Sequence, residues 1–239
     1  MTHTVSIRND GAIRFMTLNR PDKLNAMNTA LVDELSAQLV EADRDPGVAV
    51  MVISGAGRAF CAGADLSGHG DTPPASRDIA ASVNHAIAFY KLLVSLDTPM
   101  VAAVHGYALG GGCNLAIACD MVIAADNAIF GYPEVKLGMA AAGVAPPLVH
   151  QIGRKAAFEL LVLCENIGAE QAKAFGMINR IVAADDVLNQ ATEVARQLAA
   201  FNHDALWQTK QIIRRSADLS VTSALDLGRD VALAAQMYK

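Results

Sequence analysis

Two segments of the sequence share one plan, in which a run of apolar residues leads directly into a turn of glycine and alanine. Residues 48–54 (VAVMVIS) lead into 55–66 (GAGRAFCAGADL), and residues 100–104 (MVAAV) lead into 105–117 (HGYALGGGCNLAI). A continuous apolar run is typical of a strand covered on both faces, which is the strand type of parallel sheets. The pattern therefore favours an α/β fold in which two buried strands each end in a turn of small residues.

Turns of small residues leave backbone N–H groups free to point at a ligand. A carbonyl oxygen accepts two hydrogen bonds, so two such turns could converge on one oxygen atom. For either turn alone, the glycines are equally well explained by the need of the chain to turn. The occurrence of two matching turns favours a binding site.

The remaining pattern fits the same fold class. Alternating runs at residues 4–8 and 12–18 flank Asn9-Asp10-Gly11, a strong hairpin signal, and leucines every three to four positions predict a helix over 31–42. A helix over 76–96 is expected to carry one apolar stripe, formed by Ile79, Val83, Ile87, Tyr90 and Val94. Further short elements are expected as strands at 121–124 and 128–130, a glycine-rich turn at 106–112 and a short helix at 114–119. From residue 144 onward the pattern is almost wholly helical and ends in helices at 187–200, 203–217 and 221–237.

Composition excludes several functions. The net charge is −5, and the aromatic residues are seven Phe, four Tyr and one Trp, so the basic stripe and stacking platforms of nucleic-acid binders are missing. The opening MTHTVSIRND lacks an apolar signal segment, and the apolar runs are too short to span a bilayer, so we expect a cytoplasmic protein with no membrane partner. The four cysteines and six histidines show no metal-binding spacing, so no metal site is expected.

Three common glycine motifs also fail. Residues 55–60 (GAGRAF) place Phe60 where a dinucleotide-binding fingerprint needs its third glycine, which argues against NAD. Residues 110–112 (GGG) are followed by Cys and Asn and not by the Lys and Ser or Thr of a P-loop, which argues against ATP. Residues 106–110 (GYALG) have no central serine, so the nucleophile elbow of serine hydrolases is absent.

Four motifs resemble, in order and spacing, those of the enoyl-CoA hydratase/isomerase (crotonase) superfamily. They are residues 19–28 (NRPDKLNAMN), 54–66 (SGAGRAFCAGADL), 102–120 (AAVHGYALGGGCNLAIACD) and 130–138 (FGYPEVKLG). The resemblance implies a crotonase-like spiral of repeated β-β-α units over residues 1–185, followed by a helical trimerisation subdomain over 186–239. It further implies an enzyme that binds acyl-CoA thioesters, needs no cofactor beyond the coenzyme A of its substrate, and self-associates as a trimer or a dimer of trimers.

The resemblance also assigns roles to particular residues. It implies that the N–H groups of Ala64 and Gly111 form an oxyanion hole for the enolate, worth roughly 3–4 kcal/mol for each donor. We expect the Asp65 carboxylate to bond nearby backbone N–H groups and hold the first turn. Lys23 has an alternative interpretation as a solvated lysine in a turn. The residues implied to bind coenzyme A are Lys23, Leu24, Ala26, Ala62, Asp65 and Leu66.

One departure from the family pattern bears on the reaction. Hydratases of this superfamily carry two glutamates, and the corresponding positions here are Asn114 and Glu134. An amide cannot exchange protons at neutral pH, so Glu134 is left as the single acid/base group, which favours moving a double bond over adding water. Alternatives remain open: hydration with Asn114 orienting the water, a non-catalytic acyl-CoA-binding protein, and Asn114 as the N-terminal cap of a helix.

Overall fold

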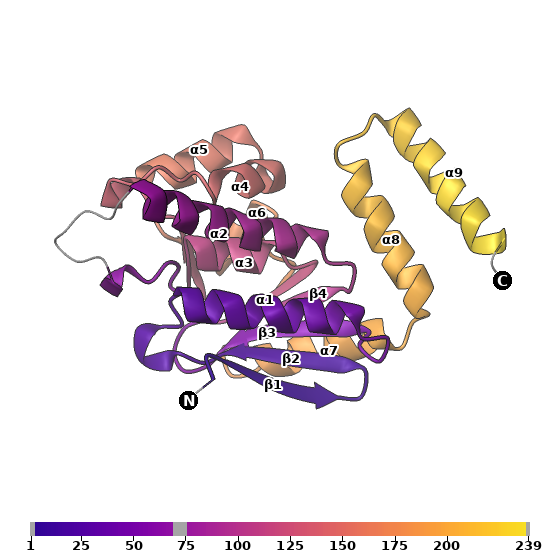
Figure 1. The fold of residues 1–239 in the computed structure, drawn as a ribbon, viewed down its shortest axis with the longest axis horizontal. Helices are drawn as coiled ribbons and strands as arrows, with labels where there is room; N and C mark the ends of the chain where they lie inside the picture. Colours follow the sequence, from indigo (N-terminus) through magenta and orange to yellow (C-terminus); the bar gives the residue numbers. More distant parts are fainter. Residues whose placement is uncertain (1–2, 69–75, 238–239) are drawn as a thin grey trace.

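The computed structural model describes residues 3–68 and 76–237, and within them the chain forms an α/β fold with two sheets (Figure 1). The larger sheet has the strand order β1-β2-β3-β4-β6-β9, and the smaller has the order β5-β7-β8. In the larger sheet only the first pair is antiparallel. No helix among the described residues is long and apolar enough to cross a membrane.

The larger sheet begins with the predicted hairpin, β1 (Val5–Asp10) and β2 (Ile13–Leu18), in which Asp10 pairs with Ile13 and Gly11 has a φ of +57°. Parallel strands follow, and β3 and β4 are buried almost throughout because helices cover both faces of the sheet. The two apolar runs of the sequence thus form neighbouring strands of the sheet. The parallel strands are β3 (Val50–Gly55), β4 (Met100–Val104), β6 (Met121–Ala125) and β9 (Arg180–Val182).

The smaller sheet lies where the strands of the larger sheet end. The chain passes from β4 into β5 (Tyr107–Leu109), and in the same way from β6 into β7 (Ile129–Gly131), which pairs with β8 (Ile167–Gly168). The crossing from β4 to β5 requires Gly106, which has a φ of +55° and where a Cβ would lie 2.1 Å from the carbonyl oxygen of Arg58. This alternation of strands between two sheets places the turns after β3 and β4 next to each other.

Helices α1 and α7 close the two faces of the larger sheet. Helix α1 (Thr29–Arg44) buries the predicted leucine face and begins at Asn28, whose side chain accepts a hydrogen bond from the Leu31 N–H at 3.0 Å. Helix α7 (Val187–Ala199) packs its buried face against β3, β4 and β6. It therefore covers the sheet, although it lies inside the range predicted for the C-terminal subdomain.

Helix α2 (Ser76–Ser95) has the expected length, but only Ile87 and Tyr90 of its predicted apolar stripe are partly buried. Ile79, Val83 and Val94 are about half exposed, with exposed fractions of 49%, 52% and 54%, whereas Phe89 and Leu93 are buried. Apolar residues occur on more than one side of this helix, so periodicity alone cannot select the buried side.

The middle of the chain also departs from the prediction. The region after residue 144 contains the strands β8 and β9, which are two and three residues long and too short to show a period. The short helix α3 (Gly111–Ile117) begins three residues earlier than expected, inside the glycine-rich turn. The other helices of this region are α4 (Ala145–Ile152), α5 (Arg154–Leu163) and α6 (Ala169–Ala174).

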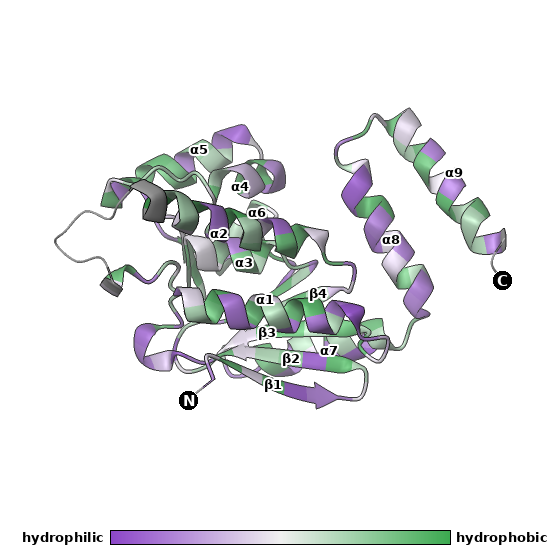
Figure 2. Cartoon of the chain, viewed as in Figure 1, coloured by the Kyte–Doolittle hydropathy of each residue, from purple (hydrophilic) through white to green (hydrophobic). Residues whose placement is uncertain are grey.

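The last two helices, α8 (His203–Ser216) and α9 (Val221–Met237), confirm the prediction and extend from the sheet-bound part of the chain (Figure 1). Both carry hydrophobic as well as hydrophilic residues along their length (Figure 2). Ile213 and Leu225 are 68% and 70% exposed. These helices thus present apolar surface that this chain alone does not bury.

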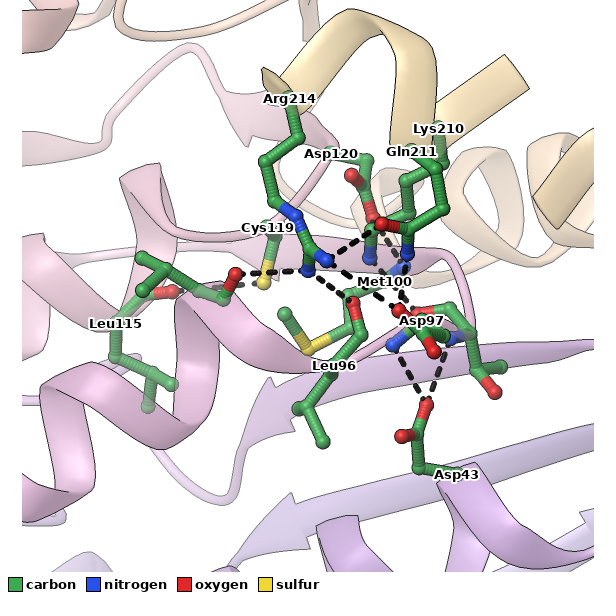
Figure 3. A network of polar contacts seen from close by, with 12 residues as sticks. Asp43, Leu96, Asp97, Met100, Leu115, Cys119, Asp120, Lys210, Gln211 and Arg214 are labelled. Carbon is green, nitrogen blue, oxygen red and sulfur yellow. Dashed lines mark hydrogen bonds and ion pairs between the residues drawn. The ribbon is translucent and has the colours of Figure 1, made fainter. Parts of the chain in front are cut away.

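A polar network joins α8 to the connection between α2 and β4 (Figure 3). Lys210 Nζ donates to the carbonyl oxygen of Thr98 at 2.9 Å and pairs with Asp120 Oδ2 at 2.7 Å. Arg214 donates to the carbonyl oxygen of Val94 at 2.9 Å. From the other side, Asp43 of α1 accepts from the Thr98 N–H at 2.7 Å. The connection is therefore fixed by α1 and α8 together.

The network predicts a specific loss of stability. Lys210→Met leaves the Thr98 carbonyl without its donor and removes the ion pair to Asp120, whose Oδ2 still accepts from the Met100 N–H. The Lys210 side chain is only 12% exposed, so the free energy of unfolding should fall by about 1–3 kcal/mol. The matched control is Arg229→Met on α9, whose ion pairs are about 60% exposed and should contribute less than about 1 kcal/mol. Urea denaturation at one fixed protein concentration measures both values. Equal losses in the two variants would show that Lys210 does not hold α8.

Candidate active site

The first small-residue turn is held by a short ladder to residues 24–27. Met27 N–H donates to the Gly63 carbonyl at 2.7 Å, and Asp65 N–H donates to the Met27 carbonyl at 2.9 Å. In such a parallel pairing the N–H of the intervening residue, Ala64, points away from the partner segment. Within the described chain this N–H has no hydrogen-bond acceptor. It is therefore free for a ligand.

The second turn is tied directly to the first. Cys61 N–H donates to the Tyr107 carbonyl at 2.9 Å, and Leu109 N–H donates to the Cys61 carbonyl at 3.0 Å, so β5 runs beside the first turn. A Cβ at Gly63 would lie 2.7 Å from the Leu109 carbonyl oxygen and 3.6 Å from the Gly111 nitrogen. The two turns are consequently in direct backbone contact.

The N–H of Gly111 is free because Gly111 opens α3, and the first N–H groups of a helix have no intrahelical acceptor. The preceding residue, Gly110, uses its own N–H to donate to the Gly131 carbonyl at 2.8 Å. Free N–H groups at Ala64 and Gly111 thus stand on two turns in contact. Such a pair of fixed donors can hold one carbonyl oxygen and stabilise negative charge that develops on it.

The three glycines of the second turn each lack room for a side chain. A Cβ at Gly110 would lie 2.5 Å from Glu134 Oε1, and Gly110 has a φ of +50°. A Cβ at Gly111 would lie 2.5 Å from Met27 Cε and 2.5 Å from Tyr90 Oη. At Gly112 it would meet the backbone oxygen of Cys61 at 2.3 Å. The first two glycines open space toward side chains of the site, and the third allows the turns to touch.

Glu134 directly precedes the 3₁₀ turn Val135–Leu137, and its carboxylate lies against Gly110. Glu134 Oε2 is buried and has no hydrogen-bond partner, the one such side-chain atom in the described part of the chain. Burial raises the pKa of this carboxyl above its ordinary range because the charged form loses solvation. An unpartnered carboxylate with a raised pKa beside free N–H donors has the properties of a general base.

Asn114 is 2% exposed and lies inside α3, so the alternative in which it caps the start of a helix is wrong. The cap position is occupied by Gly110, which has no side chain to bond the first N–H groups of the helix. The Asn114 side chain instead donates from Nδ2 to the Gly143 carbonyl at 3.2 Å, and its Oδ1 accepts from Tyr132 Oη at 3.5 Å. Its amide is thus engaged by the protein on both sides.

Asp65 acts as the sequence predicted, through a local hydrogen bond from Ser67 N–H at 3.0 Å. It also pairs with Arg20 at 2.8 Å. The Ser67 hydroxyl and the Arg20 guanidinium together lower the pKa of the Asp65 carboxyl to about 2. The carboxylate therefore stays ionised at neutral pH and fixes the residues that follow Ala64.

Arg20 and Asn25 are supporting residues that the sequence reasoning missed. Asn25 is fully buried with a φ of +56°, and its Nδ2 donates to the carbonyls of Ala56 and Ala59 at 2.9 and 2.8 Å. Its Oδ1 accepts from the Arg20 N–H at 2.9 Å. Asparagine tolerates the left-handed region, so an Asn in the turn-rich segment 19–28 was the available signal. These bonds fix that segment against the turn after β3.

The residues expected to bind coenzyme A lie on the two segments joined by the ladder. Lys23 and Leu66 are exposed, and Leu66 opens a short 3₁₀ turn, Leu66–Gly68. Most backbone N–H groups of these residues are already hydrogen-bonded within the protein and are not available to coenzyme A. The N–H groups so engaged are those of Lys23, Leu24, Ala26, Ala62 and Asp65.

The described residues contain no group of His, Cys, Asp and Glu that could hold a metal ion. Cys61, Cys113 and Cys119 are buried free thiols. Burial raises the pKa of both Cys61 and Cys113 to about 12, so neither supplies a thiolate at neutral pH.

Comparison with known proteins shows the family of the chain. The family model for enoyl-CoA hydratase/isomerase matches residues 8–236, and the chain belongs to this family, within the crotonase superfamily. The enzymes of this family act on acyl-CoA.

The 2,3-dehydroadipyl-CoA hydratase of Escherichia coli is 37% identical over 89% of this chain and 82% of its own length. The short-chain-enoyl-CoA hydratase of Clostridium acetobutylicum is 32% identical over 93% and 85%. A crystal structure of an enoyl-CoA hydratase from Mycobacterium smegmatis superposes with a TM-score of 0.92 at 27% identity, covering 98% of this chain and 91% of the other.

The glycine contacts predict separable effects on activity and folding. Gly111→Val places its side chain against the side chains of Met27 and Tyr90 and not against backbone, so the protein should fold, but the added bulk blocks the approach of a thioester to the donor. We expect kcat/KM to fall at least about 100-fold. Gly112→Ala meets the backbone of Cys61 and should lower the melting temperature.

The matched control is Gly228→Val on α9, where nothing lies within 4 Å of an added Cβ. It should leave both the melting temperature and the rate close to those of the parent protein. A Gly111→Val protein with an unchanged rate would place the oxyanion hole elsewhere.

Proposed function

We propose that this protein stabilises the enolate of an acyl-CoA thioester between the N–H groups of Ala64 and Gly111, with Glu134 as the single proton-transfer group. The observation that carries the proposal is the Glu134 carboxylate, whose Oε2 is buried and unpartnered, next to a turn that contributes a free N–H. A carboxylate left without a partner costs folding free energy, so its retention at this place favours a catalytic role.

The favoured reaction is the shift of a double bond in a 3-enoyl-CoA. Glu134 removes a proton from C2, the electrons move into the thioester oxygen, and the two N–H donors stabilise the resulting dienolate. Glu134 then returns the proton to C4, so that the C3–C4 double bond becomes a C2–C3 double bond. One carboxylate suffices because it is regenerated in its starting form.

The hydrogen bonds of Asn114 support this choice. Water addition needs a second group to deprotonate or orient the water, and the Asn114 amide cannot exchange protons at neutral pH. Both ends of the amide are also engaged, by Gly143 and Tyr132. Asn114 accordingly positions the loop that contains Gly143 against α3.

A second candidate is hydration of a 2-enoyl-CoA with Glu134 as the only carboxylate. It is favoured by the names of the relatives, since the proteins from Escherichia coli and Clostridium acetobutylicum are both described as hydratases. A third candidate, acyl-CoA binding without catalysis, leaves the buried unpartnered carboxylate of Glu134 unexplained.

The rest of the proposal concerns binding and assembly. Coenzyme A enters as part of the thioester, with no further cofactor, along the segments that contain Lys23 and Leu66. The chain forms a spiral core over residues 1–185 and a helical subdomain over 186–239 that mediates a trimer or a dimer of trimers. Exposed apolar side chains such as Ile213 on α8 and Leu225 on α9 support self-association.

The first prediction concerns Glu134→Gln, which preserves shape and removes the base. Turnover of a 3-enoyl-CoA should be abolished while the Kd for the thioester changes little, because the backbone donors remain. In the parent protein, kcat/KM should fall as the pH is lowered through the pKa of Glu134. Because burial raises this pKa, the fall should occur at a pH above the ordinary glutamate pKa of about 4.3. Rate profiles from about pH 5 to about pH 9 and calorimetric titration measure both effects. Substantial activity in Glu134→Gln would remove Glu134 as the base.

The second prediction concerns Asn114→Glu, which restores a second carboxylate beside Glu134. Hydration of a 2-enoyl-CoA should rise relative to isomerisation, and repulsion between the carboxylates should raise one apparent pKa of the pair. The ratio of the two rates is the quantity to compare, since any loss of folded protein cancels in it. Asn189→Glu on α7 is the control and should leave the ratio unchanged. An unmoved ratio in Asn114→Glu would contradict the selection of isomerisation by this residue.

A further inference from the structure

Tyr90 of α2 reaches the second small-residue turn at Gly111. Its hydroxyl oxygen would lie 2.5 Å from a Cβ at Gly111, and its ring atom Cε2 would lie 2.9 Å from a Cβ at Gly143. The ring therefore fills the space between α3 and the loop containing Gly143. This packing fixes the hydroxyl beside the residue that supplies the second N–H donor.

Tyr90 is half-buried, and its hydroxyl makes no hydrogen bond to another described residue. Its oxygen is not one of the fully buried unpartnered atoms, so it stays open to solvent or a ligand. The neighbouring Tyr132 hydroxyl, in contrast, is bonded to Asn114. Met27, the other side chain that contacts the Gly111 position, carries no donor. Tyr90 is thus an unused donor next to the proposed enolate site.

The hydroxyl also remains protonated while Glu134 is ionised. Burial, with a further contribution from the nearby Glu134 charge, raises the pKa of Tyr90 to about 12. At neutral pH the phenol is consequently a donor and not a base. Glu134 and Tyr90 approach consecutive residues of one turn, at Gly110 and Gly111, so a thioester bound there would meet both.

We propose that the Tyr90 hydroxyl donates a third hydrogen bond to the enolate oxygen, in addition to those from the N–H groups of Ala64 and Gly111. This inference rests on the proposed function and deepens it. The hydroxyl is a side-chain donor placed by packing against Gly143, so the hydrogen bond of Asn114 to Gly143 also supports it indirectly. A hydrogen bond to a charged oxygen is stronger than one to a neutral carbonyl, so the effect appears mainly on the enolate.

The test uses Tyr90→Phe, which removes the hydroxyl and keeps the ring, and Tyr107→Phe as control, since Tyr107 is exposed on β5. Three measurements are made on the full chain: kcat/KM with a 3-enoyl-CoA, the enolate absorbance of bound acetoacetyl-CoA, and the Kd for butyryl-CoA, a saturated thioester that forms no enolate without catalysis. Tyr90→Phe should lower kcat/KM and the enolate-to-keto ratio of bound acetoacetyl-CoA roughly 10- to 100-fold. Its Kd for butyryl-CoA should stay close to that of the parent protein, and Tyr107→Phe should change nothing.

Each other outcome overturns the inference in a recognisable way. Unchanged enolate absorbance in Tyr90→Phe would show that the hydroxyl does not reach the oxygen, while leaving the proposed function intact. Loss of butyryl-CoA binding together with turnover would make Tyr90 a packing residue. A parent protein that neither binds nor converts CoA thioesters would remove the proposed function and this inference together.

Discussion

The structure depends on the direct backbone contact between the turns after β3 and β4. Two hydrogen bonds through Cys61 bind the first turn to β5, and Gly112 is required because a Cβ there would lie 2.3 Å from the Cys61 carbonyl oxygen. A side chain at this place would force the two turns apart. The free N–H groups of Ala64 and Gly111 could then no longer donate hydrogen bonds to the same oxygen. Packing of neighbouring parallel strands thereby determines the geometry of the proposed oxyanion hole.

The same packing places the Glu134 carboxylate in an environment that raises its pKa. Its carboxylate lies against Gly110 in a place where one oxygen has neither solvent nor a hydrogen-bond partner. The cost of burying that group raises its pKa, and the rest of the fold must offset the cost. By contrast, Asp65 has a partner in Arg20 and a lowered pKa, and it holds the turn without exchanging protons. Environment thus gives two carboxylates of one site different roles.

The sequence predicts those parts of the fold that local patterns encode. The hairpin around Gly11, the buried strands β3 and β4, and the helix face containing Leu31 and Leu35 all follow from periodicity and turn chemistry. The strands β8 and β9 could not be predicted, because two or three residues are too few to show a period and only their pairing with distant strands defines them. Likewise, the exposed stripe of α2 and the engaged amide of Asn114 depend on which elements meet in space. The resemblance of the motifs predicts which residues form the site, and the structure shows which contacts those residues make.

In the proposed mechanism one carboxylate moves one proton on a thioester held by backbone donors. A 3-enoyl-CoA carrying deuterium at C2, converted in ordinary water and followed by mass and NMR analysis of the product, tests this proton transfer. The mechanism predicts a 2-enoyl-CoA in which part of the deuterium has moved to C4, because Glu134 takes it from one carbon and returns it to the other. Formation of a hydrated product from the 2-enoyl-CoA, with no interconversion of the two double-bond positions, would contradict this mechanism.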